Sequence, residues 1–262
     1  MVKKALLLCR QFRKYKEEDP PTKRQPALPI RLFIFIANLL CTNDKESAIQ
    51  QLIIIAFFAM MRSCEYSETP EKEKKRTKTI ELRDVSFIVK GKEVPWNGNI
   101  DGASEVLITF RRQKNDERME TISASRTGKT LCPCRAMISL VKRIRSYKTT
   151  NGRTQINAYF HNGELQFIRN TEILNKLKIV VKTMGKEDLG LNPNDVGTHS
   201  LRASYALILA LMGAPDSKIM LLGRWKSDAF MKYIKREIIK MRDDTAYKAV
   251  RAFSSNFRIK MR

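Results

Sequence analysis

The sequence has few of the residues that metal sites and disulfide frameworks need. Among 262 residues there are two histidines and five cysteines, and the only close cysteine pair is Cys132 and Cys134. A zinc site needs further cysteine or histidine ligands nearby, so we interpret this pair as packed thiols at a helix start and expect no metal there. An odd number of cysteines in a chain of this length favours a reducing compartment.

No hydrophobic run is long enough to cross a bilayer. The longest, residues 52–61, is far shorter than the about 20 residues that a membrane-spanning helix requires, and it is better interpreted as part of a core helix. The N-terminal stretch is charged within its first ten residues and does not resemble a signal peptide. The lack of a long apolar run leads us to expect no membrane partner. A Walker loop, an acidic cluster and a two-metal carboxylate set are also missing, so we expect no cofactor.

Acidic residues are scarce relative to basic ones. The chain has 50 lysines and arginines against 27 aspartates and glutamates, which gives a formal net charge of +23. Such an excess attracts a polyanion and repels itself without one. No long basic amphipathic helix carries most of this charge, so an anionic membrane surface is the weaker alternative. The composition therefore favours nucleic acid as the partner.

The chain divides into three parts. Residues 1–28 join a short basic helical segment to a stretch of prolines and charges, which predicts an arm or linker. Residues 29–242 are mainly helical in pattern and are expected to form the main domain. Residues 243–262 form a basic tail that either is exchanged between subunits or folds back on its own domain.

Hydrophobic spacing predicts where helices and strands lie. Helical periodicity occurs in the stretches 30–41, 45–66, 132–147 and 171–184. Strand-like alternation occurs in the stretches 79–82, 85–89, 105–111 and 119–122. Asn43 is a suitable cap for the second of these helices, whose centre is almost wholly apolar and must be buried. We therefore expect an α+β fold, mainly helical, in which a helical bundle accompanies a small antiparallel sheet.

One stretch near the C-terminal end of residues 29–242 contains several groups suited to an anion. His199 and Arg202 stand three residues apart at the start of an apolar helix, so they share a face and can reach one ligand. Such a pair suits phosphate, because it contains no acidic partner and no strong nucleophile. Trp225 follows in a Gly-Arg-Trp string, and Tyr233 lies eight residues further on.

A second guanidinium comes from much earlier in the chain. Arg62 lies near the predicted end of the buried helix, where it either pairs with Glu65 or faces a bound anion. Lys114 lies in the turn between two predicted strands and could protonate a leaving oxygen, although Lys92 and Lys129 compete for that role. Two guanidiniums can bind the oxygens of a phosphodiester on which negative charge develops, and a tyrosine can attack its phosphorus.

These strings together resemble the catalytic signature of a known family. MRSCEY, the lysine in ITFRRQKND, HSLR, GRW and the following tyrosine resemble that of the tyrosine recombinases, also called the phage integrase family. The spellings MRSCEY, LCPCRA and GRWKSDAFMKYI are most similar to the recombinases of Crypton and DIRS-type mobile elements. The resemblance covers about residues 28–240, in the order that the family requires. It implies that residues 29–242 form the tyrosine recombinase catalytic domain and that residues 1–28 are the remnant of an N-terminal DNA-binding domain. Its implied catalytic residues are Arg62, Lys114, His199, Arg202, Trp225 and Tyr233.

The resemblance also implies the role of each residue. The two arginines bind the phosphate, Lys114 is the general acid towards the 5′ oxygen, and Tyr233 is the nucleophile. His199 assists, and Trp225 donates one hydrogen bond where many members carry a histidine. Glu65 is expected to be a structural partner that orients the helix end. Tyr66, Tyr205 and Tyr247 are weaker nucleophile candidates, because none follows a Gly-Arg-Trp at the right distance.

The activity implied is the cutting and rejoining of DNA through a covalent 3′-phosphotyrosyl intermediate, without metal or ATP. The implied partners are double-stranded DNA and three further copies of the chain, in a tetramer on two duplexes, and the implied compartment is the nucleus in a eukaryote and the cytoplasm otherwise. Two alternatives remain open. One is a domesticated DNA-binding protein of the same fold that no longer recombines, and the other is an activity like that of type IB topoisomerases.

Overall fold

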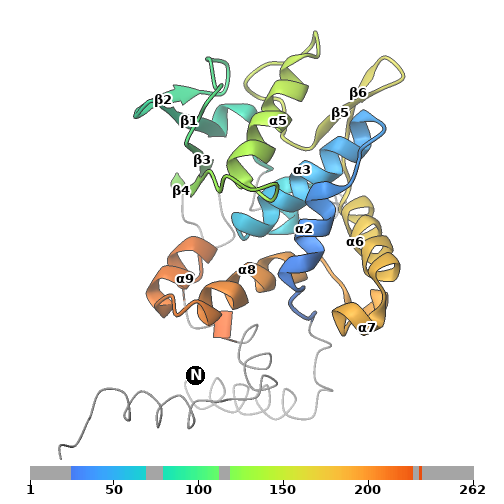
Figure 1. Cartoon of the computed structure of the whole chain (residues 1–262). Helices are drawn as coiled ribbons and strands as arrows, with labels where there is room; N and C mark the ends of the chain where they lie inside the picture. The colour runs from blue at the N-terminus through green and yellow to red at the C-terminus, as the bar shows by residue number, and fades with distance from the viewer. Residues whose placement is uncertain (1–24, 69–78, 112–118, 227–229, 232–262) are drawn as a thin grey trace, which may run out of the picture.

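The computed structural model describes residues 25–68, 79–111, 119–226 and 230–231 (Figure 1). The helices are α2 (Ile30–Asn38), α3 (Asp44–Phe58), α4 (Ser63–Tyr66), α5 (Pro133–Arg145), α6 (Asn170–Met184), α7 (Lys186–Leu189), α8 (His199–Leu211) and α9 (Asp216–Gly223). The strands are β1 (Val85–Val89), β2 (Lys92–Pro95), β3 (Glu105–Phe110), β4 (Glu120–Ser125), β5 (Ala158–His161) and β6 (Glu164–Phe167). The expected α+β class, mainly helical with a small antiparallel sheet, is confirmed.

Helix α3 lies at the centre of the fold. It packs against α5 on one side and α8 on another, and it also contacts α2, α6 and β5 (Figure 1). Leu52, Ile53, Ala56 and Phe57 are completely buried in it. A helix that is apolar all round has to be covered all round, which is why the other helices gather about it.

Helix α3 is shorter than the predicted 45–66. Met60 adopts a left-handed backbone with a φ of 43°, and the N–H of Met61 donates to the carbonyl of Ala56 at 3.0 Å. This pattern ends a helix and usually employs glycine at the left-handed position, so the sequence concealed it. Helix α4 then begins separately, and Arg62 is its N-cap residue rather than part of a continuous helix.

The larger sheet has the strand order β2-β1-β3-β4, antiparallel throughout. In β3, Val106, Ile108 and Phe110 alternate inward as predicted. The expected strand at 79–82 is wrong, because the carboxylate of Asp84 accepts the N–H of Glu81 at 2.9 Å and bends the chain into a short 3₁₀ turn. Strand β2 was not predicted, since its polar residues do not alternate.

Helices α5 and α6 begin close to their predicted starts. Pro133 occupies the first turn of α5, where its missing N–H is harmless, and the thiol of Cys132 accepts the N–H of Arg135 at 3.5 Å. Within the described residues, no group of three His, Cys, Asp or Glu side chains could hold a metal ion. In the same part of the chain, no helix is both long and apolar enough to span a membrane.

The N-cap of α3 gives a first stability prediction. The side chain of Asn43 accepts the N–H of Glu46 at 2.9 Å, as expected for a cap. Replacing Asn43 with Ala should lower the free energy of unfolding by about 1 kcal/mol, because one helix-terminal donor loses its partner. Urea denaturation followed by circular dichroism measures the change. Asn97→Ala, at an exposed loop position, is the control and should change it by less than about 0.5 kcal/mol.

Candidate active site

Helix α8 positions Arg202 inside the protein. The helix packs against α3, its residues Leu201 and Ala203 are completely buried, and Arg202 itself is only 4% exposed. The Arg202 guanidinium donates a hydrogen bond from Nη2 to the carbonyl of Gly223 at the end of α9. Its central carbon lies 4.3 Å from the ring centroid of Trp225, so the guanidinium stacks on the indole. Arg202 therefore joins α8 to the segment that follows α9.

Arg62 reaches the same segment from the other side. Its Nη2 lies 3.4 Å from the carbonyl oxygen of Arg224, and its Nη1 donates to Oε1 of Glu65 at 3.0 Å. The side chain is 15% exposed, whereas that of Glu65 is completely buried. The two arginines proposed as phosphate ligands thus end at the carbonyls of adjacent residues, 223 and 224. Both arginine side chains therefore end beside the same short segment, residues 223–224.

The Gly-Arg-Trp string is explained by this geometry. A Cβ atom at Gly223 would lie 1.8 Å from a ring carbon of Trp225, so only glycine lets the indole cross the backbone there. Arg224 ends α9 in the left-handed conformation, with a φ of 54°. The next residue, Trp225, is thereby turned back so that its ring covers the guanidinium of Arg202. Each residue of the string has a separate structural task.

Arg224 is the component that sequence reasoning missed. Its side chain is fully buried and donates to the carbonyls of Ala59 at 2.9 Å and Met60 at 3.3 Å, and to Oε2 of Glu65 at 2.8 Å. Its guanidinium also stacks 3.7 Å from the ring centroid of Phe110 in β3. Burial lowers the pKa of Arg224 from its usual value, and the carboxylate of Glu65 opposes that shift.

The structure brings together three of the candidate residues: Arg62, Arg202 and Trp225. His199 is exposed at the start of α8, one turn before Arg202, and its backbone N–H donates to the side-chain oxygen of Gln25 at 2.8 Å. Lys114 and Tyr233 lie outside the described residues, so their places remain predictions. Arg62 pairs with Glu65, which is one of the two alternatives left open by the sequence, and an anion facing Arg62 stays a prediction.

Two of the competing tyrosines are packing residues. Tyr66 is completely buried, and burial, with the nearby charge of Glu65, raises its pKa well above the usual range. Tyr205 is half-buried with its ring 5.1 Å from that of Phe57 and 5.2 Å from that of Phe58, and burial raises its pKa as well. A tyrosine nucleophile must reach solvent-borne DNA and lose its proton, so both are poor candidates.

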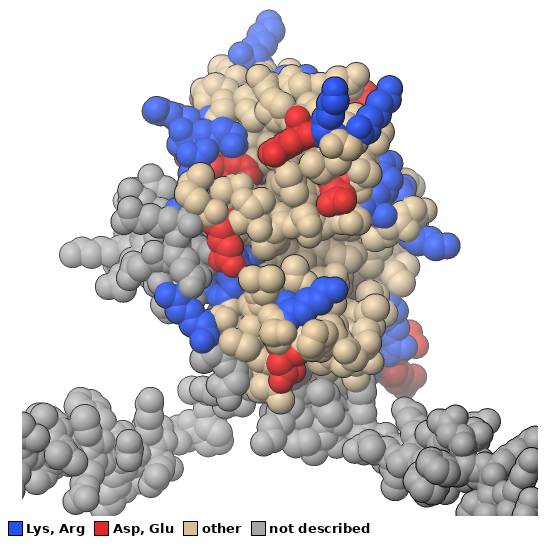
Figure 2. All heavy atoms as spheres, turned by 90° about the vertical axis from the view of Figure 1, so that its left-hand side faces the viewer, with Lys and Arg blue, Asp and Glu red and all other residues tan. Residues whose placement is uncertain are grey.

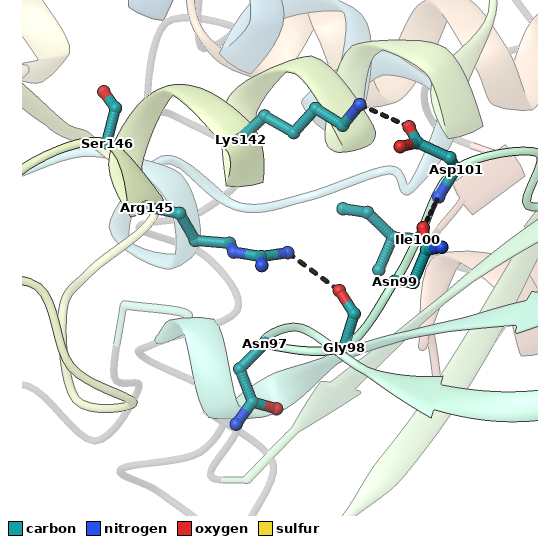
Figure 3. A pocket seen from close by; sticks show the side chains of 8 residues that line it. All are labelled: Asn97, Gly98, Asn99, Ile100, Asp101, Lys142, Arg145 and Ser146. Carbon is teal, nitrogen blue, oxygen red and sulfur yellow. Dashed lines mark hydrogen bonds and ion pairs between the residues drawn. The ribbon is translucent and has the colours of Figure 1, made fainter.

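A second basic hollow lies elsewhere on the protein. The connection from β2 to β3 and the end of α5 line an open pocket, in which Lys142 pairs with Asp101 and Arg145 donates to the carbonyl of Gly98 at 2.8 Å (Figure 3). Both cations are thus bound to the walls of the pocket itself. In Figure 1 this end of α5 is well separated from α8 and α9. The pocket does not share the chemistry of the site around residues 223–225.

The fold is similar to that of solved recombinase structures. XerH site-specific recombinase bound to its difH substrate, in a pre-cleavage complex, superimposes with a TM-score of 0.54 at 14% identity, covering 83% of this chain and 53% of XerH. Its post-cleavage complex on a palindromic difH substrate gives 0.53 at 13% identity, with 85% and 52% coverage. This chain therefore spans about half the length of XerH. No protein-family model and no curated protein matches the sequence. The chain has the fold of a tyrosine recombinase catalytic domain.

Proposed function

We propose that the protein cuts and rejoins double-stranded DNA through a covalent 3′-phosphotyrosyl intermediate, as a recombinase of a mobile element. The observation that carries the proposal is the meeting of Arg62 and Arg202 at the carbonyls of residues 223 and 224. Two guanidiniums held this way present donors in fixed geometry to a phosphodiester. Negative charge develops on the phosphate oxygens during the attack, and the two guanidiniums would stabilise it.

The proposed step uses only side chains of this chain. The hydroxyl of Tyr233 attacks phosphorus and loses its proton, the bond to the 5′ oxygen breaks, and Lys114 gives that oxygen a proton. Arg62 and Arg202 stabilise the non-bridging oxygens, with His199 and the indole N–H of Trp225 as further donors. Religation reverses these transfers, because the phosphotyrosine keeps the energy of the broken bond. No metal ion and no ATP enter the step.

Charge supports DNA as the substrate. The net charge of +23 is large for a chain of this length, and it provides phosphate contacts without sequence preference. On the face shown in Figure 2, basic side chains lie in several separate places with acidic ones between them, so this face presents no single continuous basic patch among the described residues.

We propose a homo-tetramer on two duplexes as the working assembly.

The test is capture of the covalent adduct. Protein is incubated with a pool of random-sequence duplexes, each nicked so that the cut end diffuses away, in buffer with EDTA and without ATP. We expect a protein–DNA band that survives denaturing electrophoresis, and sequencing of the captured DNA would give the preferred site. DNA binding that falls steeply with salt, with no adduct from any member of the pool, would favour the non-catalytic DNA-binding protein instead. Relaxation of supercoiled plasmid by monomeric protein would favour the topoisomerase-like activity.

Arg202→Lys should slow adduct formation by about 100-fold. Lysine keeps the positive charge, but it loses both the fork of donors and the flat surface that stacks on Trp225. Single-turnover rates on a captured DNA site measure the loss. Arg145→Lys is the matched control, because Arg145 also donates to backbone carbonyls, at Trp96 and Gly98, and lies in the separate pocket of Figure 3. Equal rates for the two variants would remove Arg202 from the mechanism.

A further inference from the structure

We propose that Arg224 is a positioning residue that keeps Arg62 available for a phosphate by neutralising the buried carboxylate of Glu65. The inference deepens the proposed function, and it rests on Arg62 and Arg202 being the phosphate ligands. Arg224 itself is fully buried and reaches no ligand. It acts through its contacts with the segments that carry the two ligand arginines.

Two guanidiniums, those of Arg62 and Arg224, share the carboxylate of Glu65. Oε1 of Glu65 accepts from the side chain of Arg62 at 3.0 Å, while Oε2 accepts from Arg224 at 2.8 Å. The backbone N–H of Arg62 also donates to Oε2, at 2.8 Å. Each carboxylate oxygen is therefore occupied by a different guanidinium, and Arg62 does not hold the carboxylate alone.

The three side chains form a charged cluster with one carboxylate and two guanidiniums. Arginine stays protonated in proteins, so Arg62, Arg224 and Glu65 together carry one net positive charge. Without Arg224, the cluster would be neutral, and among the described ion pairs only that with Arg62 would remain to the buried carboxylate. A buried charge that lacks its partner is strongly unfavourable, so the carboxylate would draw Arg62 towards itself. Arg224 thus leaves the positive charge of Arg62 for an anionic ligand.

Arg224 also contacts the backbone segments beside the two ligand arginines. Through the carbonyls of Ala59 and Met60, the Arg224 side chain fixes the turn that leads into Arg62. The main chain at Arg224 offers its own carbonyl to Arg62, and the preceding carbonyl at residue 223 accepts from Arg202. Arg224 and the residue before it therefore connect the two ligand arginines, and an error of about 1 Å in their separation can cost about 100-fold in rate.

Phosphate binding can be tested without DNA. The chain has two tryptophans, so in the Trp96→Phe background the fluorescence reports on Trp225, which lies against Arg202. Inorganic phosphate is titrated at constant ionic strength. We expect a saturable change that is lost in Arg62→Ala and in Arg202→Ala, which establishes that the signal comes from this site.

Arg224→Met should weaken phosphate binding about tenfold, comparable to the loss of one charge-assisted hydrogen bond. Arg224→Lys should recover part of that loss. In Glu65→Gln/Arg224→Met the cluster regains a net charge of +1, so phosphate should bind more tightly than to Arg224→Met alone. Arg143→Met is the matched control: Arg143 is a half-buried arginine, 10% exposed, that pairs with Asp44 at the start of α3, and its loss should leave phosphate affinity unchanged.

Thermal melts show which variants remain folded. Phosphate affinity within twofold of the parent in folded Arg224→Met would overturn the inference. If Arg224→Met does not fold, Arg224→Gln, which removes the same positive charge, decides in the same way, and parental affinity in that variant would overturn it. A parent protein that binds phosphate at this site but forms no DNA adduct would refute the proposed function and leave the inference standing, so the two failures are distinguishable.

Discussion

Tyr233→Phe is expected to abolish the covalent adduct while DNA affinity stays within about twofold of the parent. The substitution removes the phenolic oxygen that would attack phosphorus, and phenylalanine offers no replacement nucleophile. The arginines proposed to bind the phosphate are untouched, so DNA affinity should be retained. Denaturing electrophoresis on a captured DNA site measures the adduct, and gel shifts over a range of salt concentrations measure the affinity.

Two other tyrosines serve as controls for this result. Tyr66→Phe and Tyr205→Phe remove hydroxyls from residues that burial excludes as nucleophiles. The hydroxyl of Tyr66 has no hydrogen-bond partner within the described residues, so its removal should also leave stability nearly unchanged. Both variants should keep the adduct. Persistence of the adduct in Tyr233→Phe, or its loss in Tyr205→Phe, would move the nucleophile to another residue.

Glu65→Ala should lower the free energy of unfolding by about 3–5 kcal/mol. The carboxylate is fully buried and is the anion to which both Arg62 and Arg224 donate. Its removal leaves Arg224 as an uncompensated buried cation and also takes away the acceptor for the backbone N–H of Arg62 at the start of α4. The midpoint and slope of urea denaturation measure the change.

A surface carboxylate gives the comparison for this prediction. Glu93 on β2 is exposed and accepts a hydrogen bond from Ser86, so Glu93→Ala should cost less than about 1 kcal/mol. Arg224→Met combined with Glu65→Ala should be less destabilising than Glu65→Ala alone, because the stranded cation is removed as well. A loss below about 1 kcal/mol for Glu65→Ala would show that the cluster contributes little to the fold.

Much of the fold follows from local pattern. The apolar centre of α3 predicted a helix covered on every side, the alternation in β3 predicted a half-buried strand, and Asn43 predicted a cap. The pairing of Arg62 with Glu65 was one of two alternatives visible in the sequence, because residues three positions apart at a helix end are neighbours. These features depend on residues that are close in the chain.

The remaining features depend on contacts between distant residues. Helix α3 ends at a left-handed methionine, Met60, whose carbonyl accepts from Arg224, and neither fact leaves a mark in the local pattern. The tasks of Arg224 and Gly223 were hidden for the same reason, although both stand in a string that the sequence singled out. A buried arginine almost always has a charged partner, and the partner of Arg224 is Glu65, 159 residues away in the sequence. The position of β2 likewise comes from pairing with β1, not from its own polar residues.

The distance in sequence between the partners has a consequence during synthesis. Arg62 and the carbonyl of Arg224 are 162 residues apart, so this arrangement cannot form until α8 and α9 have left the ribosome, with α8 packed on α3 and α9 on α8. Loops of that length close slowly relative to local structure. A nascent or partly folded chain therefore carries its basic charge before Arg62 and Arg202 are brought to the same segment. Under the proposed function, strand cleavage is deferred until folding is complete.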